Sequence, residues 1–175
     1  MNIFVTGGAG YIGSATAEAL LKAGHSVTIY DSLSSGHRGA VPAGAHFIHA
    51  DLADESALSA ALTRERFDAV MHFAASIEAG ESMKDPGKFF HNNLVNSLHL
   101  IEAAVEADVK RFVLSSTAAV YQSSDAPLTE ESPLDPKTEY ARSKVKAERA
   151  ISALARDGFS PVFIRNGTVY GISPR

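Results

Sequence analysis

Apolar residues occur along the chain in short runs that alternate with longer segments of helical spacing. The short runs predict strands over residues 3–6, 26–30, 46–50, 69–74, 111–116 and 161–165. Apolar positions three and four residues apart predict helices over residues 12–23, 54–65, 86–107 and 138–156. Gly24 is expected to end the first of these helices, and Asp54 is expected to cap the second. The stretch 32–44, rich in Ser, Gly and Pro, is expected to be a loop.

Strands that are apolar on both faces and alternate with helices are typical of a parallel sheet covered on both sides. Right-handed crossovers then lead to a doubly wound α/β fold of strand order 3-2-1-4-5-6, the Rossmann arrangement. The sequence shows no internal repeat and no second domain, so residues 1–175 are expected to form one domain.

The composition is that of an ordinary folded domain: 45% of the residues are hydrophobic, 21% are charged, and the formal net charge is -4. Because Lys and Arg form no block, charge gives no reason to expect nucleic acid as a partner. The apolar runs are strand-sized, so no membrane partner is expected, and no secretory segment is expected before the first strand. The lack of cysteine excludes disulfides and thiolate sites and fits a cytoplasmic protein. The seven histidines are too scattered to predict a metal site.

The first predicted strand is followed by the glycine-rich sequence TGGAGYIG over residues 6–13. A glycine-rich turn is common and on its own needs no ligand. Between a strand and a helix, however, it lets the backbone approach a pyrophosphate, which then lies at the positive end of the helix dipole. We therefore expect a dinucleotide phosphate site lined by Gly7, Gly10, Tyr11, Ile12 and Gly13.

Asp31 ends the second predicted strand, close to the spacing of about 20 residues expected for an acidic residue on the adenosine ribose. A carboxylate at this position accepts hydrogen bonds from both ribose hydroxyls and repels a 2′-phosphate. NAD is therefore favoured over NADP, and Ser32 and Leu33 are expected beside the ribose. The alternative is that Asp31 only starts the loop.

Tyr140 and Lys144 are four residues apart and share one face of the predicted helix 138–156. A free phenol titrates near pH 10, so a tyrosine that acts as a base at neutral pH needs its phenolate stabilised by roughly 4 kcal/mol. Such a pair is common by chance on solvated helices. The hydroxyl-rich segment 115–117, however, follows the fifth strand at the edge where ligands bind in this fold. The combination predicts a catalytic group of Tyr140, Lys144 and a hydroxyl from the segment 115–117.

Several short motifs occur in a fixed order along nearly the whole chain: Gly7-x-x-Gly10-x-x-Gly13, Asp31, Asp51-Leu52, His72-Phe73-Ala74-Ala75, Gly80-Glu81-Ser82, Asn92-Asn93, Ser115-Ser116-Thr117, Val120-Tyr121 and Tyr140-x-x-x-Lys144. Together they resemble the NAD-dependent epimerase/dehydratase family of extended short-chain dehydrogenases/reductases. The resemblance implies NAD as cofactor and 4-epimerisation of a nucleotide sugar, such as the interconversion of UDP-glucose and UDP-galactose through a 4-keto intermediate.

The resemblance also implies roles for individual residues. Tyr140 would remove the proton of the sugar 4-hydroxyl, Thr117 would hold or relay it, and Lys144 would bind the nicotinamide ribose and tune Tyr140. Further residues would lie against the dinucleotide: Asp51, Leu52, Phe73, Ala74, Ala75, Asn93 and Ser115. The helices 86–107 and 138–156 would join two subunits in a homodimer. The alternative is that their apolar stripes face the sheet of their own subunit.

A few positions depart from the family's pattern. Ala118 and Ala119 stand where related dehydratases carry an Asp-Glu pair, and alanine transfers no proton, so dehydration is disfavoured. Ile77, Gln122 and Thr168 also differ from the usual residues, which leaves the identity of the nucleotide sugar open. A uronate epimerase, a dTDP-sugar dehydratase and a non-catalytic NAD-binding module remain alternatives.

The chain is shorter than the members of the family that it resembles. Those proteins continue well beyond this length, and their continuation supplies most contacts to the nucleotide of the substrate. The resemblance therefore implies a fragment or truncated form without the C-terminal substrate lobe. Little turnover is expected from these residues alone, because remote binding energy normally assists the chemistry.

Overall fold

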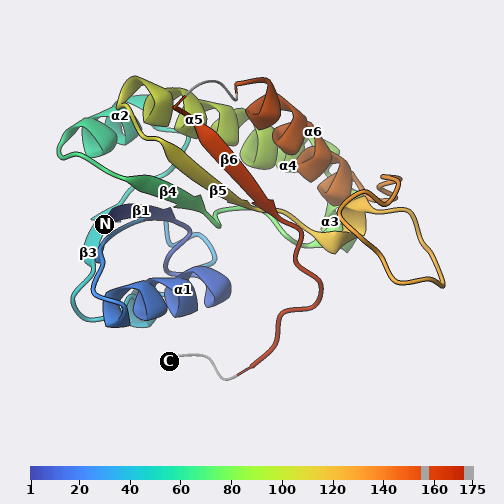
Figure 1. Cartoon of the computed structure of the whole chain (residues 1–175), viewed down its shortest axis with the longest axis horizontal. Coiled ribbons are helices and arrows are strands. Elements are labelled where there is room, and N and C mark those ends of the chain that lie inside the picture. Colours follow the sequence, from blue (N-terminus) through green and yellow to red (C-terminus); the bar gives the residue numbers. More distant parts are fainter. Residues whose placement is uncertain (155–157, 172–175) are drawn as a thin grey trace.

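The structure is a computed structural model and describes residues 1–154 and 158–171. At its centre is a six-stranded sheet (Figure 1), formed by β1 (Asn2–Thr6), β2 (Ser26–Asp31), β3 (His46–His49), β4 (Ala69–His72), β5 (Arg111–Ser115) and β6 (Ser160–Ile164). Neighbouring strands pair in parallel in the order β3-β2-β1-β4-β5-β6. The predicted doubly wound topology is confirmed.

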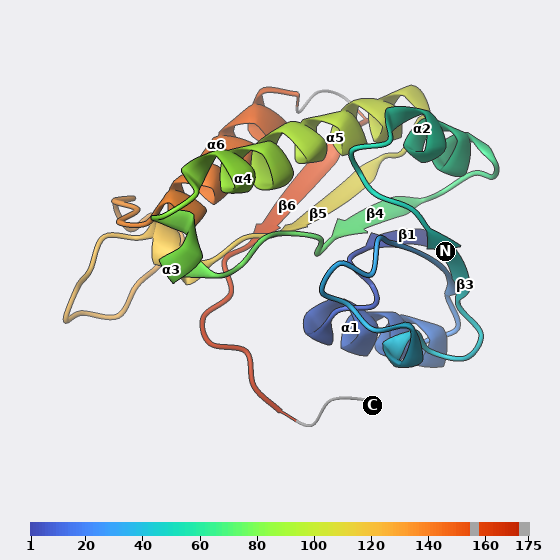
Figure 2. The same ribbon diagram turned by 180° about the vertical axis from the view of Figure 1, so that it is seen from behind.

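Helices lie on both sides of the sheet (Figure 1 and Figure 2). α1 (Tyr11–Lys22) packs on one side, whereas α2 (Glu55–Thr63), α5 (Asn96–Glu106) and α6 (Glu139–Ala153) pack on the other. Shorter elements connect them: η1 (Arg38–Ala40), α3 (Ala79–Ser82), α4 (Pro86–Phe90), η2 (His91–Val95) and η3 (Ala118–Val120). In the described part of the chain, no helix combines the length and the apolar character needed to cross a membrane.

Alternate residues of β1 face two different hydrophobic cores. Phe4 is fully buried in the larger core, beneath α2, α5 and α6. Its neighbours Ile3 and Val5 point the other way, into the smaller core that includes Ala17 of α1. Because successive side chains of a strand point to opposite faces, a strand between two helical layers must be apolar throughout. This is why the sequence shows continuous runs here instead of alternation.

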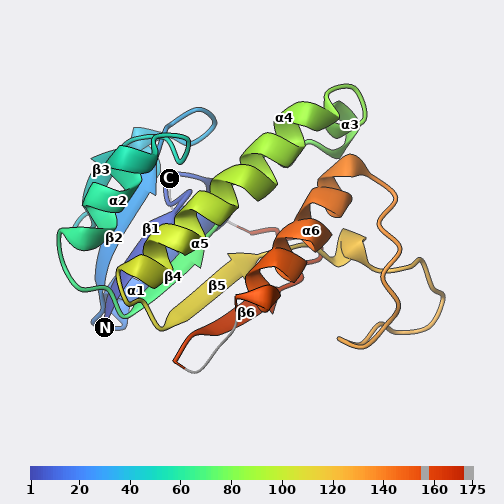
Figure 3. The same cartoon turned by 90° about the horizontal axis from the view of Figure 1, so that it is seen from above.

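The long helix predicted over residues 86–107 is present, but it is not uniform. α4, η2 and α5 follow one another as one continuous rod (Figure 3), and η2 is a π-helical segment. A π segment inserts an extra residue into the turn and is frequently found at functional sites. The hydrophobic spacing did not predict it, because one inserted residue barely alters a period read over many turns.

Other boundaries agree with the prediction to within a few residues. The Asp54 side chain accepts the Ala57 N–H at 3.0 Å and so caps α2 as expected, and Gly24 follows α1 with a φ of +80°. The helix predicted over residues 138–156 ends at Ala153, and positions 155 and 156 lie outside the described residues.

One strip of the sheet differs from the expectation of two covered faces. Val162 and Ile164 of β6 are 51% and 41% exposed, whereas Phe163 between them packs against the larger core. α1 lies under the opposite half of the sheet (Figure 1), so within residues 1–154 and 158–171 no helix covers this strip.

Candidate active site

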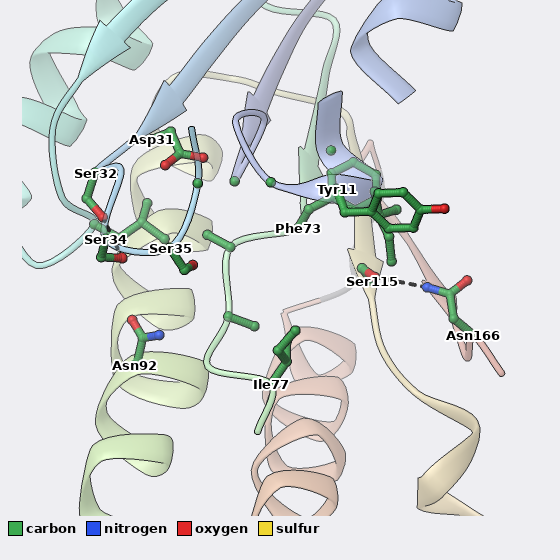
Figure 4. A pocket seen from close by; sticks show the side chains of 18 of the residues that line it. Tyr11, Asp31, Ser32, Ser34, Ser35, Phe73, Ile77, Asn92, Ser115 and Asn166 are labelled. Atoms are coloured by element: carbon green, nitrogen blue, oxygen red, sulfur yellow. Dashed lines mark hydrogen bonds between the residues drawn. The ribbon is translucent and has the colours of Figure 1, made fainter. Parts of the chain in front are cut away.

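A cavity of about 500 Å³ lies along the edge of the sheet where the strands end. In this fold that edge is where ligands bind, because the chain leaves the strands toward helices on opposite sides there. Figure 4 shows Asp31 and three serines at one end of the cavity, Phe73 near its middle, and Ser115 and Asn166 at the other end. The cavity is therefore long enough to bring together residues that are far apart in the sequence.

Nearly all residues predicted for the site line this cavity. They are Gly7, Gly10, Tyr11, Ile12, Gly13, Asp31, Ser32, Asp51, Leu52, Phe73, Ala74, Ala75, Ser115, Thr117, Tyr140 and Lys144. Two predicted residues, Leu33 and Asn93, do not line the cavity. The Leu33 backbone has a φ of 59° and contributes its N–H to Asp31, and Asn93 is buried in the π segment.

The glycine loop is held so tightly that two positions exclude any side chain. Gly7 has a φ of +70°, and a Cβ built on it would lie 2.4 Å from the backbone nitrogen of Ala74. A Cβ on Gly13 would lie 2.2 Å from the carbonyl oxygen of Gly7. Gly10 then caps α1 without a side chain, so amide groups at the start of this helix are free to face a ligand.

Asp31 connects the glycine loop to the serine-rich loop after β2. Its carboxylate accepts the N–H of Ala9 at 2.9 Å and the N–H of Leu33 at 2.8 Å, one on each oxygen. A carboxylate oxygen has two acceptor positions, so each retains one for a ligand. Ser32, Ser34 and Ser35 surround this end of the cavity (Figure 4).

The neighbouring wall is built from β2 and the segment after β3. The hydroxyl of Tyr30 donates to the carbonyl of Asp51 at 3.0 Å and fixes that turn. Burial, together with the negative charges of Asp54 and Asp51, raises the pKa of Tyr30 to about 12. Tyr30 is therefore a permanently neutral donor in the wall and has no acid–base role.

The three residues predicted to be catalytic, Thr117, Tyr140 and Lys144, lie together at the other end. Tyr140 and Lys144 project from the first two turns of α6. The residue before this helix, Thr138, caps it by accepting the N–H of Ala141 on its hydroxyl at 3.1 Å. Lys144 is 2% exposed, and its Nζ donates to the carbonyl of Ser115 at 2.9 Å. The Thr117 hydroxyl lies close enough to the phenol of Tyr140 to lower its pKa. The three side chains thus share one wall of the cavity.

The ionisation of these groups follows from their burial. Burial raises the pKa of Tyr140, and the nearby hydroxyl of Thr117 opposes that rise. Burial lowers the pKa of Lys144 to about 8, against the opposite effect of the Glu148 carboxylate. Among the chain's own groups, Thr117 is therefore the direct stabiliser of the Tyr140 phenolate, whereas Lys144 is a nearby cation whose charge depends on its surroundings.

A buried hydrogen-bonded chain connects the glycine loop to the catalytic helix. Thr6 and Ser97 bond to the two ring nitrogens of His72, at 2.6 and 2.8 Å. The hydroxyl of Ser97 donates to the carbonyl of Asn93, so Nε2 of His72 must carry the ring proton and Nδ1 must accept from Thr6. Burial lowers the pKa of His72 to about 3, which keeps this ring neutral.

The same series of hydrogen bonds continues from the π segment to α6, the helix that carries Tyr140. The Asn93 side chain accepts the Ser76 N–H at 2.8 Å and donates to the Ser76 carbonyl and to the Ser143 hydroxyl, at 2.9 and 3.1 Å. Ser143 in turn donates to the carbonyl of Tyr140 at 2.7 Å. Asn93 thus fixes the wall segment 73–77 against α6, while its neighbour Asn92 lines the cavity.

Sequence reasoning missed several residues of the site. Asn166 donates to the Ser115 hydroxyl at 3.0 Å and lines the cavity together with Ser34, Ser35, Ile77, Asn92, Gly167 and Val169. The serine-rich composition of the loop after Asp31 was a signal for two of them. We call the wall that is formed by Thr117, Tyr140 and Lys144 the catalytic wall. The side chain of Glu148 lies behind it, and no local pattern in the sequence pointed to this residue.

Comparisons with known proteins agree with this geometry. The model of the NAD dependent epimerase/dehydratase family matches residues 3–175. A UDP-glucose 4-epimerase of Corynebacterium glutamicum is 42% identical over 156 residues, which are 89% of this chain and 47% of that protein. A UDP-glucose 4-epimerase of Lactobacillus helveticus is 40% identical over 175 residues, which are 99% of this chain and 53% of that protein.

A solved structure gives the same result in three dimensions. The crystal structure of the Brucella ovis UDP-glucose 4-epimerase in complex with NAD superimposes with a TM-score of 0.90 at 36% identity, covering 94% of this chain and 51% of that one. This chain spans about half the length of the curated relatives it matches. Since the family model extends over nearly all 175 residues, the chain belongs to the NAD-dependent epimerase/dehydratase family.

Proposed function

We propose that this chain binds NAD and supplies the catalytic residues for the 4-epimerisation of a UDP-sugar, with UDP-glucose and UDP-galactose as the substrate pair. One observation carries the proposal: Thr117, Tyr140 and Lys144 line the same cavity as the glycine loop and Asp31. A hydroxyl–Tyr–Lys group beside a dinucleotide cradle suits the removal of a proton and a hydride from one alcohol. The relatives named UDP-glucose 4-epimerase favour this reaction within the family.

The cavity fits NAD in size and in the groups it offers. Its volume of about 500 Å³ lies within the range of roughly 300–1,000 Å³ typical of ligand sites. The bare backbone at Gly7 and Gly13 lets a pyrophosphate approach the start of α1. The free acceptor positions of Asp31 suit a ribose diol, and its charge opposes a 2′-phosphate, so we assign NAD and not NADP.

The chain's own residues handle the proton of the reaction. When bound, oxidised NAD supplies a hydride acceptor for C4 of the sugar and a positive charge beside the phenol. Tyr140 takes the proton of the 4-hydroxyl, and Thr117, whose hydroxyl lies close to the phenol, holds that hydroxyl in line. The ammonium of Lys144 favours the phenolate form of Tyr140 and binds the nicotinamide ribose. Return of the proton and the hydride to the 4-keto sugar completes the exchange without net oxidation.

The residues after Thr117 favour epimerisation over dehydration. Ala118 and Ala119 open η3 directly beyond the catalytic hydroxyl. Loss of water from the sugar needs a further acid and base near this position, and neither alanine carries a proton that can be exchanged. We therefore place the chain with the epimerases and not with the dTDP-sugar dehydratases.

We further propose a cytoplasmic homodimer joined through residues 86–107 and α6. These helices run side by side on one face of the molecule (Figure 3), and Leu94 and Leu98 remain partly exposed there. Most of their apolar residues are turned inward, including Leu100, Ile101 and Ile151. The contact would therefore combine this short apolar strip with the charged outer face of α6.

The proposed reaction is tested by replacing Tyr140 with phenylalanine. Purified chain, and a chain extended to the length of its relatives, are incubated with UDP-galactose, UDP-glucose and dTDP-glucose, and the products are identified by NMR. Tyr140→Phe should retain NAD and lose turnover by at least about 100-fold, because its base is missing. Tyr170→Phe removes a phenol that is 89% exposed and should change nothing. An active Tyr140→Phe variant would refute the assignment, and NAD binding without turnover in both lengths would indicate a binding module.

A further inference from the structure

A second ionisable group of α6 lies behind the catalytic wall. Glu148 is one helical turn beyond Lys144 and is only 4% exposed, while Lys144 itself is 2% exposed. Residues four apart lie on the same face of a helix. A buried carboxylate is costly unless it is paired and hydrogen-bonded, so the contacts of Glu148 indicate what it does.

Glu148 connects α6 to the ends of two strands. The hydroxyl of Ser116, the residue directly after β5, donates to one carboxylate oxygen. Arg165, the residue directly after β6, reaches the carboxylate with Nη2 at 2.7 Å and with Nε at 3.2 Å. The guanidinium also donates to the hydroxyl of Tyr121 at 2.9 Å and lies 4.9 Å from the centre of its ring. The donors to the Glu148 carboxylate therefore come from residues that directly follow β5 and β6, at the carboxyl edge of the sheet.

Lys144 and Glu148 hold two successive residues of one strand end. The Nζ of Lys144 donates to the carbonyl of Ser115 at 2.9 Å, and Glu148 accepts from Ser116. The next residue is Thr117, whose hydroxyl lies close to the phenol of Tyr140. A shift of this strand end relative to α6 would move the catalytic hydroxyl and the phenol apart.

The same carboxylate acts on the charge of Lys144. A lysine removed from water loses its proton readily, and burial does lower the pKa of Lys144 to about 8, even with the negative charge of Glu148 acting to raise it. His72, the other buried base near Lys144, stays neutral and therefore adds no positive charge that would repel the ammonium. The titratable and charged groups that face this cluster are His72 from β4, Tyr140 and Glu148 from α6, Tyr121 after η3, and Arg165 after β6.

We propose that Glu148 is a positioning residue of the active site, which keeps the buried Lys144 in its ammonium form and fixes the ends of β5 and β6 against the helix that carries Tyr140. The inference rests on the proposed function, in which the ammonium of Lys144 favours the phenolate form of Tyr140. The charge of Lys144, however, can be measured without cofactor or sugar.

The test follows the side-chain nitrogen of Lys144 by NMR on the isotope-labelled 175-residue chain, with the signal assigned through Lys144→Arg. Glu148→Gln keeps the size and a hydrogen-bonding group but removes the charge. It should lower the titration midpoint of Lys144 by about one pH unit or more. Glu106→Gln removes the same charge from an exposed position at the end of α5 and should leave the midpoint unchanged. Ser116→Ala removes one hydrogen bond but no charge, and should also leave it unchanged.

A second variant keeps the test decisive if Glu148→Gln does not fold. Glu148→Gln/Arg165→Met replaces the buried pair with two neutral side chains of similar volume, a change that buried ion pairs commonly tolerate. The Lys144 midpoint should again fall. A midpoint that stays at the wild-type value in both Glu148 variants would overturn the inference.

Failure of the proposed function would look different from failure of this inference. If the chain did not bind NAD, measured by calorimetry, while the Lys144 midpoint still responded to Glu148→Gln, the assignment of the cavity would be wrong and the charge coupling would stand. If NAD bound and the midpoint did not respond, the role of Glu148 would be refuted and the cofactor site would stand.

Discussion

The glycine loop and the catalytic wall line the same cavity, but they are held in place by different means. The loop is built from backbone: Gly7 and Gly13 leave no room for a Cβ, because the backbone of Ala74 lies against Gly7 and the carbonyl of Gly7 lies against Gly13. The wall is built from side chains of β5, α6 and the residue after β6, joined through Lys144, Glu148 and Arg165. The loop is thus specified by steric contacts between backbone atoms, and the wall by contacts of buried charged side chains.

This difference predicts two kinds of sensitivity. A change in the loop acts through atomic overlap, so its effect should not depend on pH. A change in the wall acts through desolvated charges, so its effect depends on which partner is removed. Variants of each region therefore test this contrast.

Gly13→Ala should be the most damaging single change. The new Cβ would lie 2.2 Å from the Gly7 carbonyl oxygen and 2.9 Å from the Gly8 Cα, and backbone atoms on both sides cannot rotate away. We expect the free energy of unfolding to fall by more than about 4 kcal/mol and NAD affinity to fall by at least about 100-fold. Urea unfolding and calorimetry measure the two effects. Gly39→Ala, where a Cβ meets nothing within 4 Å, is the control and should stay near wild type.

Arg165→Met tests the catalytic wall through the free energy of unfolding. It leaves the Glu148 carboxylate buried without its cation, which should lower the free energy of unfolding by about 3–4 kcal/mol. Lys137→Met removes the cation of an ion pair with Asp135 whose side chains are 73% and 47% exposed, and should cost less than about 1 kcal/mol. Chemical denaturation of both variants gives the comparison. Equal losses would show that the burial of the Arg165 pair is energetically irrelevant.

His72→Gln examines the hydrogen-bonded chain between the two regions. The pKa of His72 is about 3 in the folded chain, below its usual value of 6.5, so the unfolded chain takes up the proton first. Its contribution to stability is therefore complete above about pH 6.5 and is lost as the pH falls toward 3. The free energy of unfolding of the wild type should fall by about 2 kcal/mol more than that of the variant between pH 7 and pH 5.

The control for this pH effect is His91→Gln, which changes an exposed histidine of the π segment. It should retain the wild-type dependence on pH in urea unfolding at the same two pH values. An identical pH dependence in the wild type and in His72→Gln would contradict the assignment of a buried, neutral ring.

Thr138→Ala should give the smallest effect. The hydroxyl of Thr138 accepts the Ala141 N–H at 3.1 Å and starts the helix that carries Tyr140. Loss of this cap should lower the free energy of unfolding by about 1 kcal/mol, whereas Thr138→Ser keeps the acceptor and should lose only a few tenths. Thermal unfolding distinguishes the two. A Thr138→Ala variant with the same stability as the wild type would show that packing alone sets the start of α6.

The predictions that came from sequence were most accurate where local rules apply. The strand order β3-β2-β1-β4-β5-β6 and the cap at Asp54 follow from hydrophobic runs and from capping chemistry, and both are confirmed. The π segment at Asn93 was not predicted, because an extra residue in one turn is decided by what the helix packs against. Spacing alone likewise could not tell that Asn92 faces the cavity while Asn93 lies behind it.

The glycine motif, the acidic residue after the second strand and the spacing of the Tyr140–Lys144 pair could be recognised from the sequence, because each is defined by residues close together in the chain. The fold decided which tautomer His72 adopts and which carboxylate accompanies Lys144. A motif is visible in the sequence when the residues that define it lie close together in the chain. The energy of a buried charge, in contrast, is set by the partners that the fold brings beside it.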